Sequence, residues 1–340
     1  MRTLLHPALV HPAGSDPGLW IDLPDEGRAL LFDLPALEHL PPRKLARVAH
    51  VVVTHMHMDH FVGFDHLLRS ALRREEPLTI TGPSGFLASV RGRIGAYTWN
   101  LIESYPLRLR VQEVTGGRIR AEEYGGWSSM RGVAGGEREF GGTVHAERAF
   151  RVDVVELDHG IPVLGVAVRE VEHLAINRDR LEREGLVPGE WLGELKDAVR
   201  RGAERDTPIE VEQGDGGRST RPLGALADAI VVRGRGQVIV YLTDLVGSEA
   251  NLERAAALAH DADLLVCEAV FLDEDRSLAA ARKHLTARQA GELARRAGAR
   301  RLAVFHFSSR YQGREAELMR EASEAFGTAI LSLPVATIRP

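Results

Sequence analysis

The chain has 340 residues, a net charge of −5 and a charged fraction of 27%, so it can form one large globular domain or two ordinary ones. The mild negative charge argues against non-specific nucleic-acid binding over the whole surface but does not exclude a local basic groove. No apolar run approaches the ~18 residues of a membrane span, and the single cysteine, Cys267, excludes an internal disulfide framework. We therefore expect a cytoplasmic protein without a membrane anchor or a signal peptide.

Short apolar runs, separated by polar turns and amphipathic segments, predict strands mixed with helices. The expected strands are residues 29–34, 51–54, 78–81, 152–157, 163–168, 237–242, 263–268 and 301–307. The expected helices are residues 61–73, 250–260 and 286–297. The last helix is the best marked, because Thr286 and Gln289 have the spacing of a capping box and Gly298 stands where a helix ends. This mixture indicates a layered α/β or α+β protein.

Two segments lack this pattern. Residues 124–149 are rich in glycine and have no sustained period, which predicts a long loop or mobile flap. Residues 169–233 contain few apolar runs and much charge, which predicts an inserted arm outside the core. We expect a single domain over residues 1–340 that contains both segments.

The densest group of ionisable side chains is the sequence HMHMDH, which supplies His55, His57, Asp59 and His60 directly after an expected strand. Four ligand-type residues within six positions indicate a metal site. His55 and His57 are two residues apart, so a turn must aim both at one ion. Asp59 and His60 begin the next helix and can serve a second ion.

Further candidate ligands follow other expected strands, namely His159, Asp244, Glu268 and His306. Ligand sites in layered α/β proteins gather at strand ends, so these residues can converge although they are far apart in the sequence. Imidazole and carboxylate groups suit Zn²⁺, Mn²⁺ or Fe²⁺. Two ions about 3.5–4 Å apart need a bridging carboxylate, and Asp244 is the candidate for that position.

With these residues assembled, the sequence resembles the metallo-β-lactamase superfamily and, within it, the ribonuclease Z branch of tRNA 3′-processing endonucleases. The superfamily motif HxHxDH is HMHMDH here. The branch is indicated by further stretches: ITGPSGF (80–86), SYPLRLRVQEV (104–114), LDHGIPVLG (157–165), YLTD (241–244), CEAVF (267–271) and HLTARQAGELARRAGARRLAVFHFSSRYQG (284–313). The resemblance covers roughly residues 50–320.

The resemblance implies a four-layer αββα sandwich with a site for two divalent ions, Zn²⁺ in the first place, at the rim of its sheets. The implied ligands are His55, His57 and His159 for one ion, Asp59, His60 and His306 for the other, and Asp244 between them. The resemblance also implies that Asp59 orients the nucleophile, that His284 and Glu268 form an acid–base pair, that Arg310 holds phosphate, and that residues 169–233 bind RNA. The implied activity is removal of the 3′ trailer of precursor tRNA by a homodimer.

Some features depart from the branch. The glycine loop expected after the first strand is absent, Glu190 replaces a common proline at the arm tip, and acidic residues outnumber basic ones between 168 and 222. A clamp on phosphates should be basic, so a phosphodiesterase for a small-molecule or other nucleic-acid substrate is the alternative. An acyl hydrolase is disfavoured by Arg310 and the His284–Glu268 pair. An inactive RNA-binding protein is disfavoured because every ligand position is filled.

Overall fold

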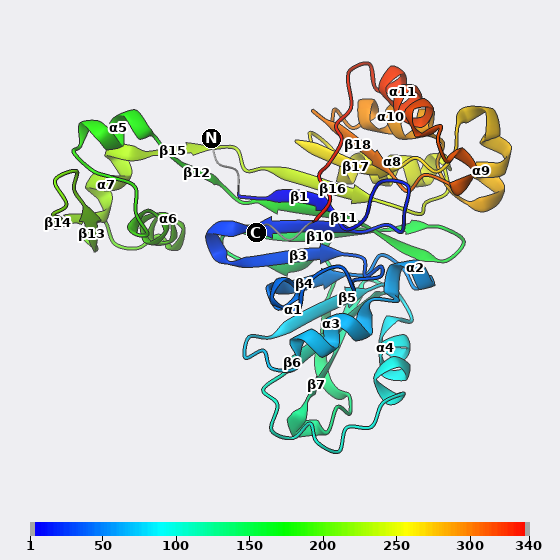
Figure 1. Cartoon of the computed structure of the whole chain (residues 1–340), viewed down its shortest axis with the longest axis horizontal. Coiled ribbons are helices and arrows are strands. Elements are labelled where there is room, and N and C mark those ends of the chain that lie inside the picture. The colour runs from blue at the N-terminus through cyan, green and yellow to red at the C-terminus, as the bar shows by residue number, and fades with distance from the viewer. Residues whose placement is uncertain (1–3, 337–340) are drawn as a thin grey trace. The chain divides into compact units, whose positions relative to one another are not determined.

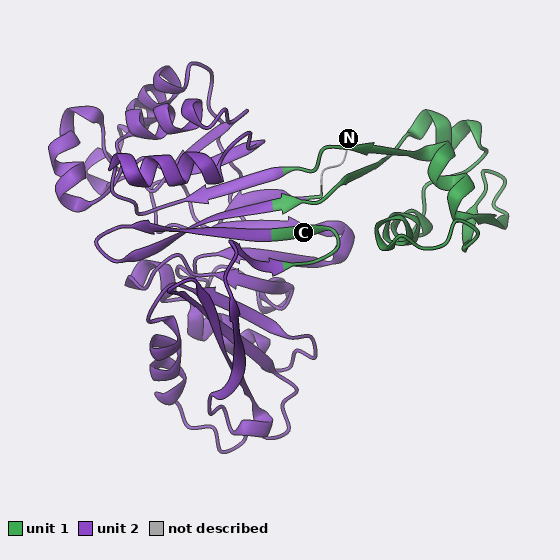
Figure 2. Ribbon diagram, turned by 180° about the vertical axis from the view of Figure 1, so that it is seen from behind, with its two compact units in different colours: residues 1–4, 146–151, 169–237 green, residues 5–145, 152–168, 238–340 purple. Residues whose placement is uncertain are grey.

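The computed structural model describes residues 4–336 and divides into two compact units, which Figure 2 distinguishes by colour. Residues 169–237 form most of the smaller unit, together with residues 146–151. The larger unit contains the other strands and helices, including all those that carry the predicted metal ligands. Within the part of the chain that the structure describes, no helix is long and apolar enough to cross a lipid bilayer.

The first sheet of the larger unit follows the order of the chain from one edge to the other. Its strands are β1 (His6–Leu9), β2 (Leu19–Leu23), β3 (Arg28–Phe32), β4 (Val48–Val52), β5 (Leu78–Gly82), β6 (Arg108–Thr115), β7 (Arg118–Gly125) and β8 (Val133–Glu139). Strands β3 to β6 pair in parallel, which requires a crossover between each pair. The crossovers contain α1 (Pro42–Leu45), α2 (Met58–Phe61), α3 (Phe64–Ala71) and α4 (Phe86–Gly95).

The second sheet combines three strands that follow one another in the chain, β9 to β11, with three parallel strands. Its order is β18 (Leu302–Phe305), β17 (Leu264–Glu268), β16 (Val238–Leu242), β11 (Pro162–Glu170), β10 (Phe150–Asp158) and β9 (Thr143–Ala146). Strands β16, β17 and β18 are parallel. The helices that accompany them are α8 (Glu249–Leu258), α9 (Arg276–Arg282), α10 (Ala287–Arg296) and α11 (Glu315–Phe326). Short 3-10 turns lie at η1 (Pro24–Glu26), η2 (Gly126–Ser128), η3 (Asp273–Asp275) and η4 (Ser309–Tyr311).

The helices cover the outer faces of the two sheets. One hydrophobic cluster packs α3 and α4 against the first sheet through residues such as Phe64 and Phe86, and a second packs α10 and α11 against the second sheet through Leu293 and Leu318 (Figure 1). The sheets meet at their inner faces, where the rings of Phe32 and Tyr241 are 6.1 Å apart. The predicted αββα sandwich is therefore confirmed.

The expectation of a loop at residues 124–149 is wrong, because this segment contains β8, β9 and the end of β7. Strand β8 lies at the edge of its sheet and is largely exposed on both faces. An edge strand of this kind needs no apolar alternation. Polar cross-strand pairs such as Arg118 with Glu137 take its place, so the strand leaves no apolar pattern in the sequence.

The smaller unit has its own fold and its own core. It contains β12 (His173–Ile176) paired with β15 (Val231–Gly234), and β13 (Pro208–Glu212) paired with β14 (Arg218–Pro222). Its helices are α5 (Arg178–Arg183), α6 (Trp191–Arg201) and α7 (Leu223–Ile230). Trp191, Leu195 and Leu226 are among its buried side chains. Apolar positions about one helical turn apart fill this small core, which explains why the sequence shows few apolar runs here.

Candidate metal centre

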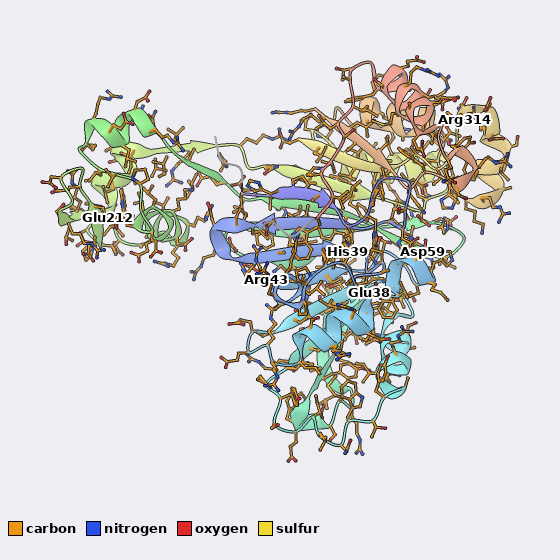
Figure 3. The ribbon with its side chains drawn as sticks, in the orientation of Figure 1. Glu38, His39, Arg43, Asp59, Glu212 and Arg314 are labelled. Carbon is orange, nitrogen blue, oxygen red and sulfur yellow. The ribbon has the colours of Figure 1, made fainter. Side chains whose placement is uncertain are left out.

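The ligand-type side chains predicted from the sequence come from the ends of strands in both sheets. His55 and His57 follow β4, and Asp59 and His60 lie on the short helix α2, where Figure 3 labels Asp59. The others lie on the second sheet: His159 follows β10, Asp244 follows β16, Glu268 ends β17 and His306 follows β18. The carboxyl ends of parallel strands meet at one edge of a sheet, so distant positions in the sequence become neighbours.

One group of potential ligands contains three histidines and a carboxylate. Ligand atoms of His55, His57, His159 and Asp244 all lie within 4.8 Å of one another. The Nε2 atoms of His55 and His159 are 3.6 Å and 3.5 Å from Asp244 Oδ2. Burial, followed by the neighbouring His60, lowers the pKa of His55 to about 2. His55 is therefore neutral near pH 7, which is the form that binds a metal ion.

Asp59 and His60 adjoin the same carboxylate. His60 Nε2 lies 3.5 Å from Asp59 Oδ2 and 3.6 Å from Asp244 Oδ2. Burial disfavours the charged form of His60, but Asp33 and Asp244 raise its pKa well above the ordinary value. Burial also raises the pKa of Asp59, yet the hydrogen bond and charge of His60 lower it to about 2.

The donor atoms at this centre suit divalent cations. His60 Nε2 is completely buried and has no hydrogen-bond partner among the described residues, although two carboxylates face it. A buried polar atom without a partner is costly, and a cation between these groups would remove that cost. Imidazole nitrogen and carboxylate oxygen are the ligands of Zn²⁺, Mn²⁺ and Fe²⁺ sites. The residues present therefore fit a metal centre.

A second group consists of Asp244, Glu268, His284 and His306, whose ligand atoms also lie within 4.8 Å of one another. His306 Nδ1 lies 3.0 Å from Asp244 Oδ1. Burial lowers the pKa of His306, but the Asp244 carboxylate outweighs it and raises the value to about 10. Asp244 thus contacts both groups of histidines, as a bridging ligand would.

Glu268 organises the loops around this second group. Its side chain is fully buried and accepts hydrogen bonds from the backbone N–H groups of Asp244 and Leu285, both at 2.9 Å. It also accepts a hydrogen bond from His284 Nδ1 at 2.9 Å. Burial opposes the charge of His284, but Glu268 raises its pKa above the ordinary value. The contact leaves His284 Nε2 as the atom of the ring that can reach a substrate.

Three functional side chains stand on left-handed backbone. Asp33, Asp244 and His306 have φ angles of 63°, 53° and 61°, and each lies one or two residues beyond a strand. This conformation turns the chain sharply at the strand end. Aspartate and histidine tolerate it better than most residues, so the same backbone device aims all three side chains at the centre.

Asp33 was not among the candidates from the sequence, although it is the last residue but one of the expected strand 29–34 and directly follows β3. Its buried carboxylate accepts hydrogen bonds from the Thr54 backbone at 2.6 Å, from His60 Nδ1 at 2.9 Å and from the Tyr241 hydroxyl at 3.0 Å. These contacts fix the ring of His60 so that Nε2 faces Asp59 and Asp244. The strand-end rule used for the other ligands also applies to Asp33 and would have found it.

Arg310 lies on η4, four residues after His306, and its side chain is exposed. It borders a pocket of about 460 Å³ beside the second group of ligands. The pocket is lined by Gly14, Ser15, Asp16, Val270, Phe271, Leu278, Arg282, His284, His306, Phe307, Ser308, Ser309 and Arg310. Two arginines beside His284 make this the side of the centre best suited to anionic groups.

Comparisons with known proteins agree with this fold and centre. Residues 152–307 match a family model described as a beta-lactamase superfamily domain. The chain is 32% identical to a ribonuclease Z of Deinococcus radiodurans, over 96% of this chain and 97% of the relative. It is also 32% identical to a ribonuclease Z of Bacillus cereus, over 92% of this chain and 91% of the relative.

Two solved structures share the fold at lower sequence identity. Human tRNase Z, short form, aligns with a TM-score of 0.55 and 17% identity over 98% of this chain and 96% of its own. The metallo-beta-lactamase fold protein YhfI of Bacillus subtilis aligns with a TM-score of 0.55 and 13% identity over 98% and 96% of the two chains. The near full-length match to the curated relatives decides the classification. The chain belongs to the ribonuclease Z family and is a metal-dependent hydrolase of the metallo-β-lactamase fold.

Proposed function

We propose that this protein is an endonuclease that removes the 3′ trailer of precursor tRNA. The predicted ligands would hold two divalent ions, for which Zn²⁺ is the first candidate. The observation that carries the proposal is one buried carboxylate, Asp244, next to the His284–Glu268 pair. Its Oδ2 faces His55, His60 and His159, and its Oδ1 faces His306. One ion would be held by His55, His57 and His159, and the other by Asp59, His60 and His306. The relatives named ribonuclease Z support this substrate class.

Two bound divalent cations would supply a nucleophilic water near neutral pH and neutralise charge on the scissile phosphate. The chain itself sets the geometry. Asp59, with its low pKa, stays ionised and accepts a hydrogen bond from the attacking water, so that a lone pair points at phosphorus. Asp33 fixes the His60 ring from behind, and the Lys283 carbonyl accepts a 2.8 Å hydrogen bond from His159 Nδ1 and fixes that ring in the same way.

His284 is placed to act as the general acid. With Nδ1–H donated to Glu268, its Nε2 can carry the proton that the leaving 3′-oxygen needs. The raised pKa of His284 keeps that proton in place near pH 7. The P–O bond to the 3′-oxygen breaks as this proton moves, and the products are a 3′-hydroxyl and a 5′-phosphate on the trailer. Glu268 stays ionised and orients the ring.

Arg310 and the pocket beside it accommodate the nucleotide that carries the leaving oxygen. Phe271 and Phe307 give the pocket apolar lining, and Arg282 and Arg310 give it positive charge. The planar guanidinium of Arg310 can hold two phosphate oxygens at once. A nucleotide needs both kinds of surface, whereas an acyl substrate does not need the arginines.

The arm is the one feature that favours a second candidate function. Its arginines pair with carboxylates on the same unit, as Arg221 does with Glu184 at 2.8 Å and Arg233 with Glu172 at 2.6 Å. Internal pairing reduces the charge available to RNA phosphates. The second candidate is therefore a phosphodiesterase that uses the same centre on a small-molecule or other nucleic-acid substrate.

We further propose that the protein is a cytoplasmic homodimer. A single buried cysteine is compatible with a reducing compartment. Tyr97, Leu101 and Trp127 are 46%, 79% and 58% exposed on the segments that follow α4 and β7. Large apolar side chains left at the surface are typical of contacts between subunits, and a second copy of the chain would cover them. Light scattering of the wild type and of Leu101→Glu tests this, with a monomeric variant expected.

One experiment separates the two candidate functions. The purified protein is stripped of metal, reloaded with Zn²⁺, Mn²⁺ or Fe²⁺, and assayed on a precursor tRNA with a 3′ trailer and on bis-p-nitrophenyl phosphate. Cleavage at the 3′ end of the tRNA body, with two ions bound per chain, is expected. Hydrolysis of the small diester with no cleavage of the precursor would reject the tRNA proposal and favour the second candidate.

A further inference from the structure

Large apolar side chains stand exposed directly beside the metal ligands. Met58, between His57 and Asp59 in the sequence, is 80% exposed. Val62 is 39% exposed and Ile161 is 38% exposed. Contact of such side chains with water is unfavourable. Other residues of α2, His60 and Phe61, are buried, so the exposure of the three apolar side chains at the edge of the active site needs an explanation.

These residues border the same end of the metal centre. Met58 and Val62 are four residues apart and joined by a hydrogen bond from the Val62 N–H to the Met58 carbonyl at 2.8 Å, so they share one helical face. Ile161 lies on the β10–β11 turn, where its carbonyl accepts a hydrogen bond from the His159 N–H at 3.0 Å. We call Met58, Val62 and Ile161 the apolar rim.

The rim lies where His57 and His159 meet. The rings of these two histidines are 5.3 Å apart, and each belongs to a short segment that also carries a rim residue. His57 does not line the pocket beside Arg310, whereas His284 and His306 do. The centre therefore has two borders of different chemistry, a pocket with arginines and the apolar rim, and they adjoin at His159, whose ring is also 4.9 Å from that of His284.

A phosphodiester bound at the ligands extends a nucleoside toward each border. The nucleoside with the leaving oxygen must lie toward His284, the proposed acid, and hence toward the pocket. The nucleoside that keeps the phosphate then lies toward the rim. We propose that the rim receives the base of this nucleotide, which is the first nucleotide of the trailer. The inference rests on the proposed function.

The chemistry of the rim explains how it can accept any base. Every base has an apolar face, and contact with that face makes no distinction between sequences. The long, flexible thioether side chain of methionine adapts to surfaces of different shape. A contact of this kind accepts any base, whereas hydrogen bonds to base edges would select among trailers by sequence.

The test compares two precursor tRNAs, identical except that one lacks the base of the first trailer nucleotide. Wild type is expected to lose about tenfold in kcat/KM on the abasic precursor, since contact with one base is worth about 1–3 kcal/mol. The double variant Met58→Ala, Ile161→Ala should show that loss already on the complete precursor and no further loss on the abasic one. Val133→Ala, which truncates a side chain that is 43% exposed on β8, is the matched control and should behave as wild type.

The outcomes distinguish the two proposals. If the losses from the double variant and from the missing base multiply, or if the wild type cleaves both precursors equally well, the rim does not hold the base. Either result would leave the proposed endonuclease function standing. A wild type that cleaves neither precursor would reject the proposed function and the rim with it. The metal content and melting temperature of each variant are measured as well, because a changed metal content would show that the rim supports the ligands and does not hold a base.

Discussion

The hydroxyl of Tyr241 donates a hydrogen bond to the carboxylate of Asp33 at 3.0 Å. Tyr241 lies on β16 of the second sheet, and Asp33 follows β3 of the first, so this contact joins the sheets directly behind the metal centre. Both side chains are fully buried. Since Asp33 also accepts a hydrogen bond from His60, packing of the core and alignment of a proposed ligand depend on the same carboxylate.

Tyr241→Phe removes one donor from this buried carboxylate. We expect the free energy of unfolding to fall by roughly 1–2 kcal/mol and metal affinity to fall by about tenfold, as for other groups that orient a ligand. Urea unfolding and metal titration measure the two effects. Tyr124→Phe is the control, because its hydroxyl donates to Glu122 on β7 at 2.6 Å; it should lose stability and keep its metal affinity.

His284→Ala removes the proposed general acid. We expect kcat on precursor tRNA, whose leaving group is a poor one, to fall by about 10²-fold or more. Bis-p-nitrophenyl phosphate, whose leaving group needs no proton, should lose much less. Equal losses on both substrates would show that His284 is not the acid. His260→Ala replaces an exposed histidine on the surface and should change neither rate.

The stability of the metal-free protein should depend on pH in a direction set by His306 and His60. Carboxylates raise the pKa of His306 to about 10 and that of His60 well above 6.5. A raised pKa in the folded state adds stability that is complete below about pH 6.5 and is lost as the pH rises through the folded value. Urea unfolding with a chelator present should therefore give a lower free energy at pH 10 than at pH 7.

Two controls accompany this pH series. His306→Gln should weaken it, because the variant has no proton to lose at that position and only the contribution of His60 remains. Zn²⁺ should reduce the pH dependence, since binding displaces protons from the histidines and the ion takes over their role. A metal-free protein that became more stable between pH 7 and pH 10 would contradict the assignment of these raised pKa values.

Arm variants should change the salt dependence of RNA binding. Glu184→Gln releases Arg221 and Asp228→Asn releases Arg205 from exposed ion pairs. If the arm contacts RNA phosphates, each released arginine should tighten binding of precursor tRNA and steepen the slope of log K against log salt by about one. The control in the larger unit is Glu253→Gln, since Glu253 on α8 faces Arg296 on α10. An unchanged slope in both arm variants would mean that the arm does not bind the phosphates.

Apolar runs predicted the central strands well, because a strand covered on both faces needs consecutive apolar residues. Strands β16, β17 and β18 agree with the expected ranges 237–242, 263–268 and 301–307 to within a few residues. The edge strand β8 could not be found in this way, since its partners are charged side chains on the neighbouring strand. The helices of the smaller unit were missed because their core is too small to require long apolar segments.

The candidate site followed from one rule, that ligands gather at strand ends, together with the HMHMDH motif. The structure brings His55, His159 and Asp244 within contact of one another although the sequence separates them by up to 189 positions. The supporting contacts could not be predicted, because a hydrogen bond such as that from Tyr241 to Asp33 depends on how the two sheets face each other. The exposure of Met58 likewise follows from the turn of α2, which the motif alone does not specify.

The left-handed backbone at Asp244 and His306 restricts which substitutions are informative. A residue with a β-carbon and no local hydrogen bond is destabilised there by roughly 1–2 kcal/mol, so alanine perturbs the backbone and the metal chemistry together. Asparagine tolerates the same φ and has nearly the same shape as aspartate. Asp244→Asn therefore isolates the loss of charge, and Asp244→Gly should fold more stably than Asp244→Ala while binding metal no better. At these strand ends, main-chain geometry alone restricts which amino acids are tolerated, independently of catalysis.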